Sequence, residues 1–163
     1  MKNLLIVHHS LTGGTAQLAQ AALRGAQAES GVRTQLLNAV DAGPGHLLAA
    51  DGYLFATPEN LAAVAGLMKD FFDRCYYPAL DHIQGRPYAT MVCAGSDGHN
   101  AARQIARIAT GWRLRAAAEP LIVCTHAQTP EQILAPKHIG ASDLRSAEEL
   151  GAALAAGLSL GVF

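Results

Sequence analysis

Hydroxyl side chains and two adjacent glycines are grouped in one short segment near the start of the chain. Ser10, Thr12 and Thr15 supply three hydroxyls, and Gly13 and Gly14 stand where a helical pattern begins. Unpaired amides at a helix start, together with the positive end of the helix dipole, suit a phosphate without a cation. Glycine lets the backbone approach the anion, and hydroxyls add further donors. The spacing therefore predicts a phosphate site along Ser10, Leu11, Thr12, Gly13, Gly14 and Thr15.

This first segment differs from the common nucleotide-binding loops. No Gly-Lys-Ser/Thr run follows it, as a Walker loop requires, and the dinucleotide pattern Gly-x-Gly-x-x-Gly is missing. A Gly-x-Ser-x-Gly elbow is also missing, which disfavours a serine hydrolase. The alternative to a phosphate site is structural, with Thr12 capping the helix. His8 and His9 precede the segment at a strand end, where one side chain points inward and the other outward, and both packing and ligand roles stay open for them.

A second candidate segment follows a later apolar run and comprises Thr57, Pro58, Glu59, Asn60 and Leu61. Pro58 is expected to end the preceding strand, because proline lacks the amide that a sheet ladder needs. Backbone amides and short polar groups would then be available beyond the strand. The alternative is a polar turn with no ligand. Lys69 and Asp73, further along, have the spacing of a solvated ion pair on a helix.

A third candidate segment is rich in glycine and short polar residues, and its candidate contacts are Ala94, Gly95, Ser96, Gly98 and His99. The two glycines permit a close backbone approach to a ligand. The imidazole of His99 could offset negative charge on that ligand, and a surface histidine without a role is the alternative. Asp97 has two equally open roles, in helix capping and in ligand contact.

Strands and helices alternate along the chain and give these segments a common location. Strands are expected at about residues 4–7, 32–37, 51–57, 88–94 and 121–124. Helices are expected after residues 13–14, at about 66–77 and 101–112, and from Ser142 or Ser146 onward. Residues 38–50 are expected to form a turn-rich connection, with a helical turn possible at its end. The alternation predicts one α/β domain, residues 1–163, with a doubly wound parallel sheet and helices on both faces. Ligands of such sheets bind beyond the carboxyl ends of the strands. The three segments follow the first, third and fourth strands, so we expect them to meet at one edge.

The composition excludes several classes of protein. Of 163 residues, 50% are apolar, 6% are aromatic and 15% are charged, which is typical of alanine-rich helices packed closely on an aliphatic sheet. The net charge of −1, without a basic run, disfavours nucleic acid and anionic membranes as partners. No apolar stretch reaches the roughly 18 residues of a membrane span, and the short apolar run before His8 does not resemble a signal peptide. We therefore expect a cytoplasmic protein, and the sparse charge favours an oligomer that covers apolar surface.

The potential metal ligands and thiols are dispersed. Cys75, Cys93 and Cys124 lie far apart in apolar segments, as buried free thiols do. Zinc would require pairs of ligands at short spacings, which are absent. No metal site is predicted.

The segment from Ser10 to Thr15 resembles the flavodoxin phosphate loop, Ser/Thr-x-Thr-Gly-x-Thr, in which hydroxyls and amides hold the phosphate of FMN. Gly14 stands where that family usually has asparagine. The run Asp-Gly-apolar-Thr-Pro, a short loop and then Lys-Asp-Phe-x-Asp-Arg resemble flavodoxin-like NAD(P)H-dependent FMN reductases and quinone reductases. The resemblance extends over roughly residues 3–123.

This resemblance implies a flavodoxin-like sheet of five parallel strands in the order 2-1-3-4-5, with FMN as the cofactor and NAD(P)H as the electron donor. The second segment would run along the isoalloxazine ring and the third would approach its other edge. The acceptor would be a quinone, a flavin or another small molecule, and the chain would form a homo-dimer or homo-tetramer. The chemistry would belong to the flavin, so no catalytic side chain is named.

Two other functions remain open at this stage. An electron-transfer flavodoxin would serve a protein partner, but such carriers have an acidic surface and ring-stacking aromatics. The second segment offers Asn60 and Leu61 instead, and the chain is nearly neutral. A flavodoxin-like domain with weak flavin affinity and no catalysis is the other alternative, which the glycine at position 14 keeps open.

Overall fold

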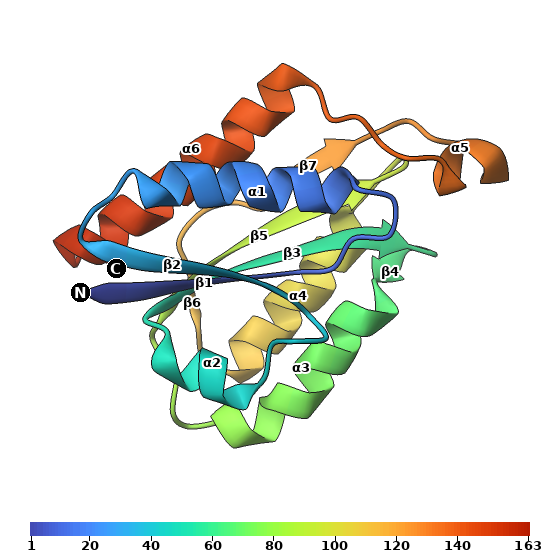
Figure 1. The fold of residues 1–163 in the computed structure, drawn as a ribbon. Coiled ribbons are helices and arrows are strands. Elements are labelled where there is room, and N and C mark those ends of the chain that lie inside the picture. Colours follow the sequence, from blue (N-terminus) through green and yellow to red (C-terminus); the bar gives the residue numbers. More distant parts are fainter.

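A central, mainly parallel sheet separates two layers of helices in the computed structural model, which describes residues 1–163 (Figure 1). The strands are β1 (Lys2–His8), β2 (Val32–Asn38), β3 (Gly52–Asn60), β4 (Ala63–Val64), β5 (Pro87–Ala94), β6 (Arg115–Ala116) and β7 (Leu121–Cys124). The helices are α1 (Gly14–Gln27), α2 (Pro44–Ala49), α3 (Gly66–Ala79), α4 (His99–Gly111), α5 (Pro130–Leu134) and α6 (Ala141–Leu160).

The predicted flavodoxin-like α/β architecture is confirmed, but the number of strands was wrong. The sheet has seven strands, with the path β2-β1-β3-β5-β6 and with β4 and β7 off this path. β6 pairs with the beginning of β5 and β7 with its end, so both lie along the same edge. β4 forms an antiparallel hairpin with β3. β4 and β6 contain only two residues each, too few to give a periodic pattern in the sequence.

Pro58 does not end its strand, contrary to expectation. The carbonyl of Ala56 accepts a hydrogen bond from the amide of His9 (3.2 Å), so Ala56 bonds toward β1. Pro58 lies two residues later and faces the same side, where β1 has ended at His8. No ladder bond is therefore lost, and β3 continues into its hairpin with β4.

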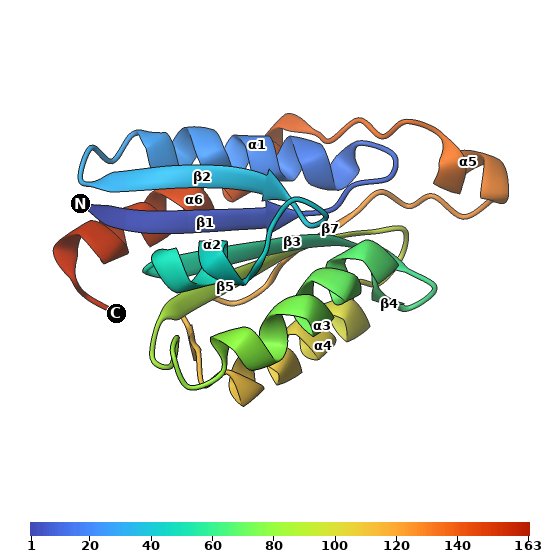
Figure 2. The same ribbon diagram turned by 60° about the horizontal axis from the view of Figure 1, so that its bottom comes forward.

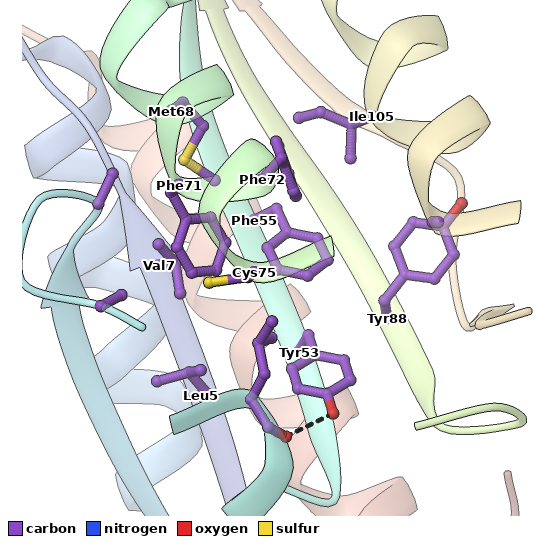
Figure 3. Close-up of a cluster of buried hydrophobic side chains, with 14 of the residues drawn as sticks. Leu5, Val7, Tyr53, Phe55, Met68, Phe71, Phe72, Cys75, Tyr88 and Ile105 are labelled. Atoms are coloured by element: carbon purple, nitrogen blue, oxygen red, sulfur yellow. Dashed lines mark hydrogen bonds between the residues drawn. The ribbon is translucent and has the colours of Figure 1, made fainter. Parts of the chain in front are cut away.

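The alternation of side chains along the buried strands gives each layer its core. Leu4 and Ile6 of β1 pack with α1 and α6, whereas Leu5 and Val7 pack with the layer of α2, α3 and α4. The second core contains the aromatic cluster of Tyr53, Phe55, Phe71, Phe72, Tyr88 and Trp112. Figure 3 shows part of this cluster and the hydrogen bond from the Tyr53 hydroxyl to Leu47.

Glycine sets the close packing of α1 on α6, which lie side by side over one face of the sheet (Figures 1 and 2). A Cβ atom on Gly151 would lie 2.0 Å from the carbonyl oxygen of Ala22, and one on Gly25 would lie 1.9 Å from that of Glu148. The two backbones therefore approach each other at points where one of the two helices has a glycine.

No helix of this fold has the length and apolar character needed to cross a membrane.

Candidate functional site

A pocket of about 400 Å³ lies beyond the carboxyl ends of the strands, where the predicted segments meet. The first loop lies on the side of α1, and the β3–β4 hairpin lies on the opposite side (Figure 2). Twelve of the sixteen predicted residues line this pocket: Ser10, Leu11, Thr12, Gly14, Thr15, Pro58, Glu59, Asn60, Leu61, Ala94, Gly95 and Ser96. Gly13, Thr57, Gly98 and His99 do not line it.

The first loop is folded around the start of α1. Gly13 has a φ of 95°, a conformation that glycine adopts without strain, and its amide donates to the Ser10 hydroxyl (3.2 Å). The structure records no side-chain cap on α1, which removes the alternative of Thr12 as a capping residue. The first amides of α1 therefore have no side-chain acceptor at the pocket.

Thr15 carries the most informative polar atom of the site. Its side chain is buried, with 2% exposure, and its hydroxyl has no hydrogen-bond partner in the protein. A buried hydroxyl without a partner is costly, and this one belongs to a pocket wall at a helix N-terminus. An anion there would accept from the hydroxyl and from the first helical amides, so the residues present fit a phosphate group.

Cys93 explains the glycine at position 14. A Cβ atom on Gly14 would lie 2.7 Å from the Cys93 sulfur, so the thiol fills the space that a side chain would need. Burial raises the pKa of Cys93 to about 11, which keeps the thiol neutral beside the loop.

The second segment has a structural role in addition to forming a wall of the pocket. The Glu59 carboxylate accepts from the amides of Gly98 (2.9 Å) and Ala101 (3.0 Å), and so caps the start of α4. The buried Thr57 hydroxyl donates to the Pro58 carbonyl (2.8 Å) and accepts from the Ala65 amide (3.2 Å). Both hydrogen bonds are within the protein, and Thr57 does not line the pocket. This segment offers a ligand its backbone, the exposed Asn60 side chain and apolar surface.

Two residues at the tip of the hairpin adopt a strained conformation. Leu61 and Ala62 have φ values of 50° and 60°, which non-glycine residues adopt at a cost of about 1–2 kcal/mol each. Both line the pocket, and the side chain of Leu61 is fully exposed. Leu11, in the first loop, is also exposed.

The third segment contributes its first half to the pocket. Gly98 adopts a φ of 92° at the start of α4, where a Cβ atom would lie 2.6 Å from Ile122. His99 is exposed outside the pocket and its Nδ1 lies 2.6 Å from the Asp97 carboxylate. The hydrogen bonds with His99 hold the pKa of Asp97 below its ordinary value. In the structure the imidazole of His99 pairs with Asp97 and does not line the pocket, and its contact with a ligand stays a prediction.

The two histidines before the first loop also lie outside the pocket lining. The His8 side chain is buried, and its Nδ1 lies 3.1 Å from the Leu37 carbonyl, which can only accept. Burial lowers the pKa of His8, and partial burial lowers the pKa of His9. His8 therefore has a packing role.

A further wall comes from the segment that follows β7. It contributes five lining residues that were not predicted: Thr125, Ala127, Gln128, Ile133 and Lys137. The other two are Ala62, in the β3–β4 hairpin, and Cys93, in β5. The fifth predicted strand ends at the same edge as the others, and that position could have identified Thr125. No such signal marks Lys137, which lies thirteen residues beyond the strand and after a short helix that was not predicted.

The pocket contains little charge and no aromatic side chain. Glu59 is its only acid and Lys137 its only lysine or arginine. The Lys137 ammonium donates to the carbonyls of Gln132 (2.8 Å), Ile133 (2.8 Å) and Ala135 (2.6 Å) at the end of α5. A bound anion would therefore depend on neutral donors, and a bound ring would meet backbone and side chains that are aliphatic or polar without charge.

Comparison with known proteins finds similarity to FMN reductases, quinone reductases and flavodoxins. The sequence profile of a family described as NADPH-dependent FMN reductase matches residues 45–127, just over half of the chain. An NAD(P)H dehydrogenase (quinone) from Acidithiobacillus ferrooxidans is 29% identical over 94 residues, which cover 45% of this chain and 47% of that protein. A flavodoxin from Aquifex aeolicus is 28% identical over 98 residues, covering 60% and 53% respectively. The matches thus span about half the length of these curated relatives.

The fold is shared with solved structures of low sequence identity. A flavodoxin from the domain Archaea superposes with a TM-score of 0.77 at 18% identity, covering 96% of this chain and 98% of that one. The flavodoxin, WrbA-like protein of Agrobacterium tumefaciens gives a TM-score of 0.70 at 20% identity, covering 98% and 99%.

Proposed function

The chain belongs to the family of NADPH-dependent FMN reductases, and on that premise we propose that it binds FMN in the pocket and transfers electrons from NAD(P)H to a small acceptor such as a quinone or a second flavin. The observation that carries the proposal is the buried hydroxyl of Thr15, which lacks a partner at the N-terminus of α1. A phosphate group satisfies such a site without a cation.

The proposal assigns roles to three walls of the pocket. Ser10, Thr12 and Thr15 and the first amides of α1 hold the phosphate. The backbone of Pro58 to Leu61 and of Ala94 to Ser96, which lines the pocket, would face the flavin ring. FMN, when bound, would supply the redox chemistry, which is the transfer of electrons from a nicotinamide to the acceptor.

The protein's own contribution is positioning and an accessible ring face. No aromatic side chain lines the pocket, so none covers the ring by stacking. The exposed Leu11 and Leu61 offer aliphatic contacts at the mouth of the pocket. This arrangement favours direct access of a nicotinamide and a small apolar acceptor.

Flavin binding and reduction test the proposal in sequence. Purified protein is titrated with FMN, and binding is followed by the quenching of flavin fluorescence. NADPH or NADH is then added without oxygen, and the expected result is loss of the visible flavin absorbance, which returns when a quinone is added. A protein that does not bind FMN contradicts the whole proposal. Bound FMN that neither nucleotide bleaches contradicts the reductase activity alone.

Electron transfer to a protein partner is the second candidate, and the match to the flavodoxin of Aquifex aeolicus favours it. The net charge of −1 argues against it, because acidic surfaces steer carriers to basic partners. The carrier function predicts that NAD(P)H reduces the bound flavin only when a separate reductase protein is added.

A further inference from the structure

The segment Thr125–Ile139, here called the strap, connects β7 to α6 and passes over one side of the pocket. Its helix α5 projects beyond the ends of the strands in both views (Figures 1 and 2). α5 has no buried residue, so the hydrophobic core does not fix its position. The hydrogen bonds at its two ends, together with the buried side chain of Ile139, therefore hold the strap in place.

The first end of the strap is bonded to the third segment of the pocket. The Thr125 amide donates to the Ala94 carbonyl (2.8 Å), and the His126 amide donates to the Gly95 carbonyl (2.8 Å). A Cβ atom on Gly95 would lie 2.9 Å from the Ala127 carbonyl oxygen, so the two backbones are in close contact here.

The second end is bonded to the phosphate loop, mainly through one side chain of α1. The Gln17 amide group donates to the carbonyls of Lys137 (2.8 Å) and Gly13 (3.0 Å), and its oxygen accepts from the Ile139 amide (3.1 Å). The Lys137 amide also donates to the Thr12 carbonyl (2.8 Å). Gln17 thus joins the loop to residues that lie 120 positions later in the chain.

These bonds fix the direction of a peptide group at the phosphate site. The Gly13 carbonyl accepts from both the backbone amide (3.1 Å) and the side chain (3.0 Å) of Gln17. In a trans peptide the carbonyl and the following amide point in opposite directions. The Gly14 amide, the first of α1, is therefore directed away from the helix body and toward its N-terminal end.

The absence of an available cation makes this orientation important. Lys137 is the only lysine or arginine in the lining, and its ammonium already donates to three carbonyls of the strap. An anion must be held by amides and hydroxyls, whose contribution depends on their being oriented before the ligand arrives.

We propose that Gln17 is the positioning residue of the phosphate site. By binding the Gly13 carbonyl and the strap together, it orients the loop amides and determines how strongly the protein prefers FMN to riboflavin, the same flavin without a phosphate. This inference rests on the proposed function, and it adds a residue outside the pocket lining that controls recognition of the phosphate group.

Two substitutions on α1 test the role of Gln17. Gln17→Met keeps the length and helix propensity but removes all three hydrogen bonds, and Gln20→Met makes the same change at an exposed position of the same helix. The dissociation constants for FMN and riboflavin are measured by fluorescence quenching. Gln17→Met is expected to weaken FMN binding about tenfold while leaving riboflavin binding nearly unchanged, and Gln20→Met to change neither.

Amide hydrogen exchange of the protein without flavin provides a second measurement. Exchange at Lys137 and Ile139 should be faster in Gln17→Met than in the wild-type protein or in Gln20→Met. If Gln17→Met does not fold, Gln17→Glu replaces it. This variant keeps an acceptor for Ile139 but places a carboxylate against two carbonyls, and it too should lower the preference for FMN.

Three results would overturn the inference. Equal weakening of FMN and riboflavin would show that Gln17 only supports the fold. An unchanged FMN affinity would show that the loop amides are oriented without it. A wild-type protein that binds FMN no better than riboflavin would exclude a phosphate site. A wild-type protein that binds neither flavin refutes the proposed function itself, which separates that failure from the others.

Discussion

Thr15 has a hydroxyl that the protein alone leaves without a partner, and this makes it a precise probe of ligand binding. Thr15→Val removes the hydroxyl at nearly constant volume. We expect FMN binding to weaken about tenfold, because one hydrogen bond to a charged group is lost, while the unfolding free energy does not fall. Fluorescence titration and thermal unfolding check the two effects.

Thr34→Val is the matched control, because Thr34 on β2 has the only other buried hydroxyl without a partner and does not line the pocket. It should leave FMN affinity unchanged. Equal affinities in the two variants would contradict a phosphate at Thr15.

Gly14 and Cys93 form a complementary pair. Gly14→Asn alone should lower the unfolding free energy by about 1–3 kcal/mol, because its Cβ atom would lie 2.7 Å from the Cys93 sulfur. Combining it with Cys93→Ala opens the space, so the double variant should be more stable than the sum of the two single changes predicts. Denaturant unfolding of all four proteins measures this coupling, and additive effects would contradict it.

The residues of the site were predictable to the extent that they lie in recognisable loops. The hydroxyls and glycines from Ser10 to Thr15 mark a helix start in the sequence, and the structure brings five of these six residues to the pocket. The sequence predicts His99 at the same pocket, because it does not reveal that Asp97 binds the His99 imidazole. The strap was missed because Lys137 joins the site through a backbone bond to Thr12, 125 residues away.

The α1–α6 contact is the element-scale feature with the clearest energetic consequence. Gly151→Ala would place a methyl group 2.0 Å from the Ala22 carbonyl oxygen, which belongs to rigid helical backbone. We expect a loss of about 3 kcal/mol in unfolding free energy, since the two helices must separate. Gly66→Ala, with nothing within 4 Å of the new methyl group, should cause no loss. Denaturant unfolding of both variants checks this, and similar stabilities would contradict the close approach.

The elements themselves were largely predictable, and the differences have local causes. The continuous aliphatic runs of β1 and β7 identified buried parallel strands. β4 and β6 were not predicted, because a strand of two residues is defined only by its hydrogen bonds to a neighbouring strand. The extension of β3 through Pro58 depends on where β1 ends, which is a property of the sheet and not of the residues of β3.

The assembly of the whole molecule remains a prediction. Charged residues are sparse, and large apolar side chains such as Leu67 and Tyr77 on α3 are exposed. Such surface favours a homo-dimer or homo-tetramer. Sedimentation velocity measures the mass directly, and a protein that sediments as a 17.0 kDa monomer at micromolar concentration would contradict the prediction.

The stability of the whole molecule should depend on pH through His8. Burial lowers the pKa of His8 in the folded protein, whereas the unfolded chain has the ordinary value of about 6.5. The unfolded state therefore binds more protons as the pH falls below about 6.5, and the unfolding free energy decreases until the pH passes the lower folded value. The stabilising effect of a neutral His8 is fully present above about pH 6.5.

His8→Asn separates this titration from other effects of pH. Its side-chain amide can still donate to the Leu37 carbonyl, but it does not take up a proton. Between about pH 7.5 and 5.5, the unfolding free energy of this variant should fall less steeply than that of the wild-type protein. His82→Asn changes an exposed histidine and serves as the control, with the wild-type slope expected. Parallel pH profiles for the wild-type protein and His8→Asn would show that His8 does not lose its proton on folding, and that the acid sensitivity of the fold has another origin.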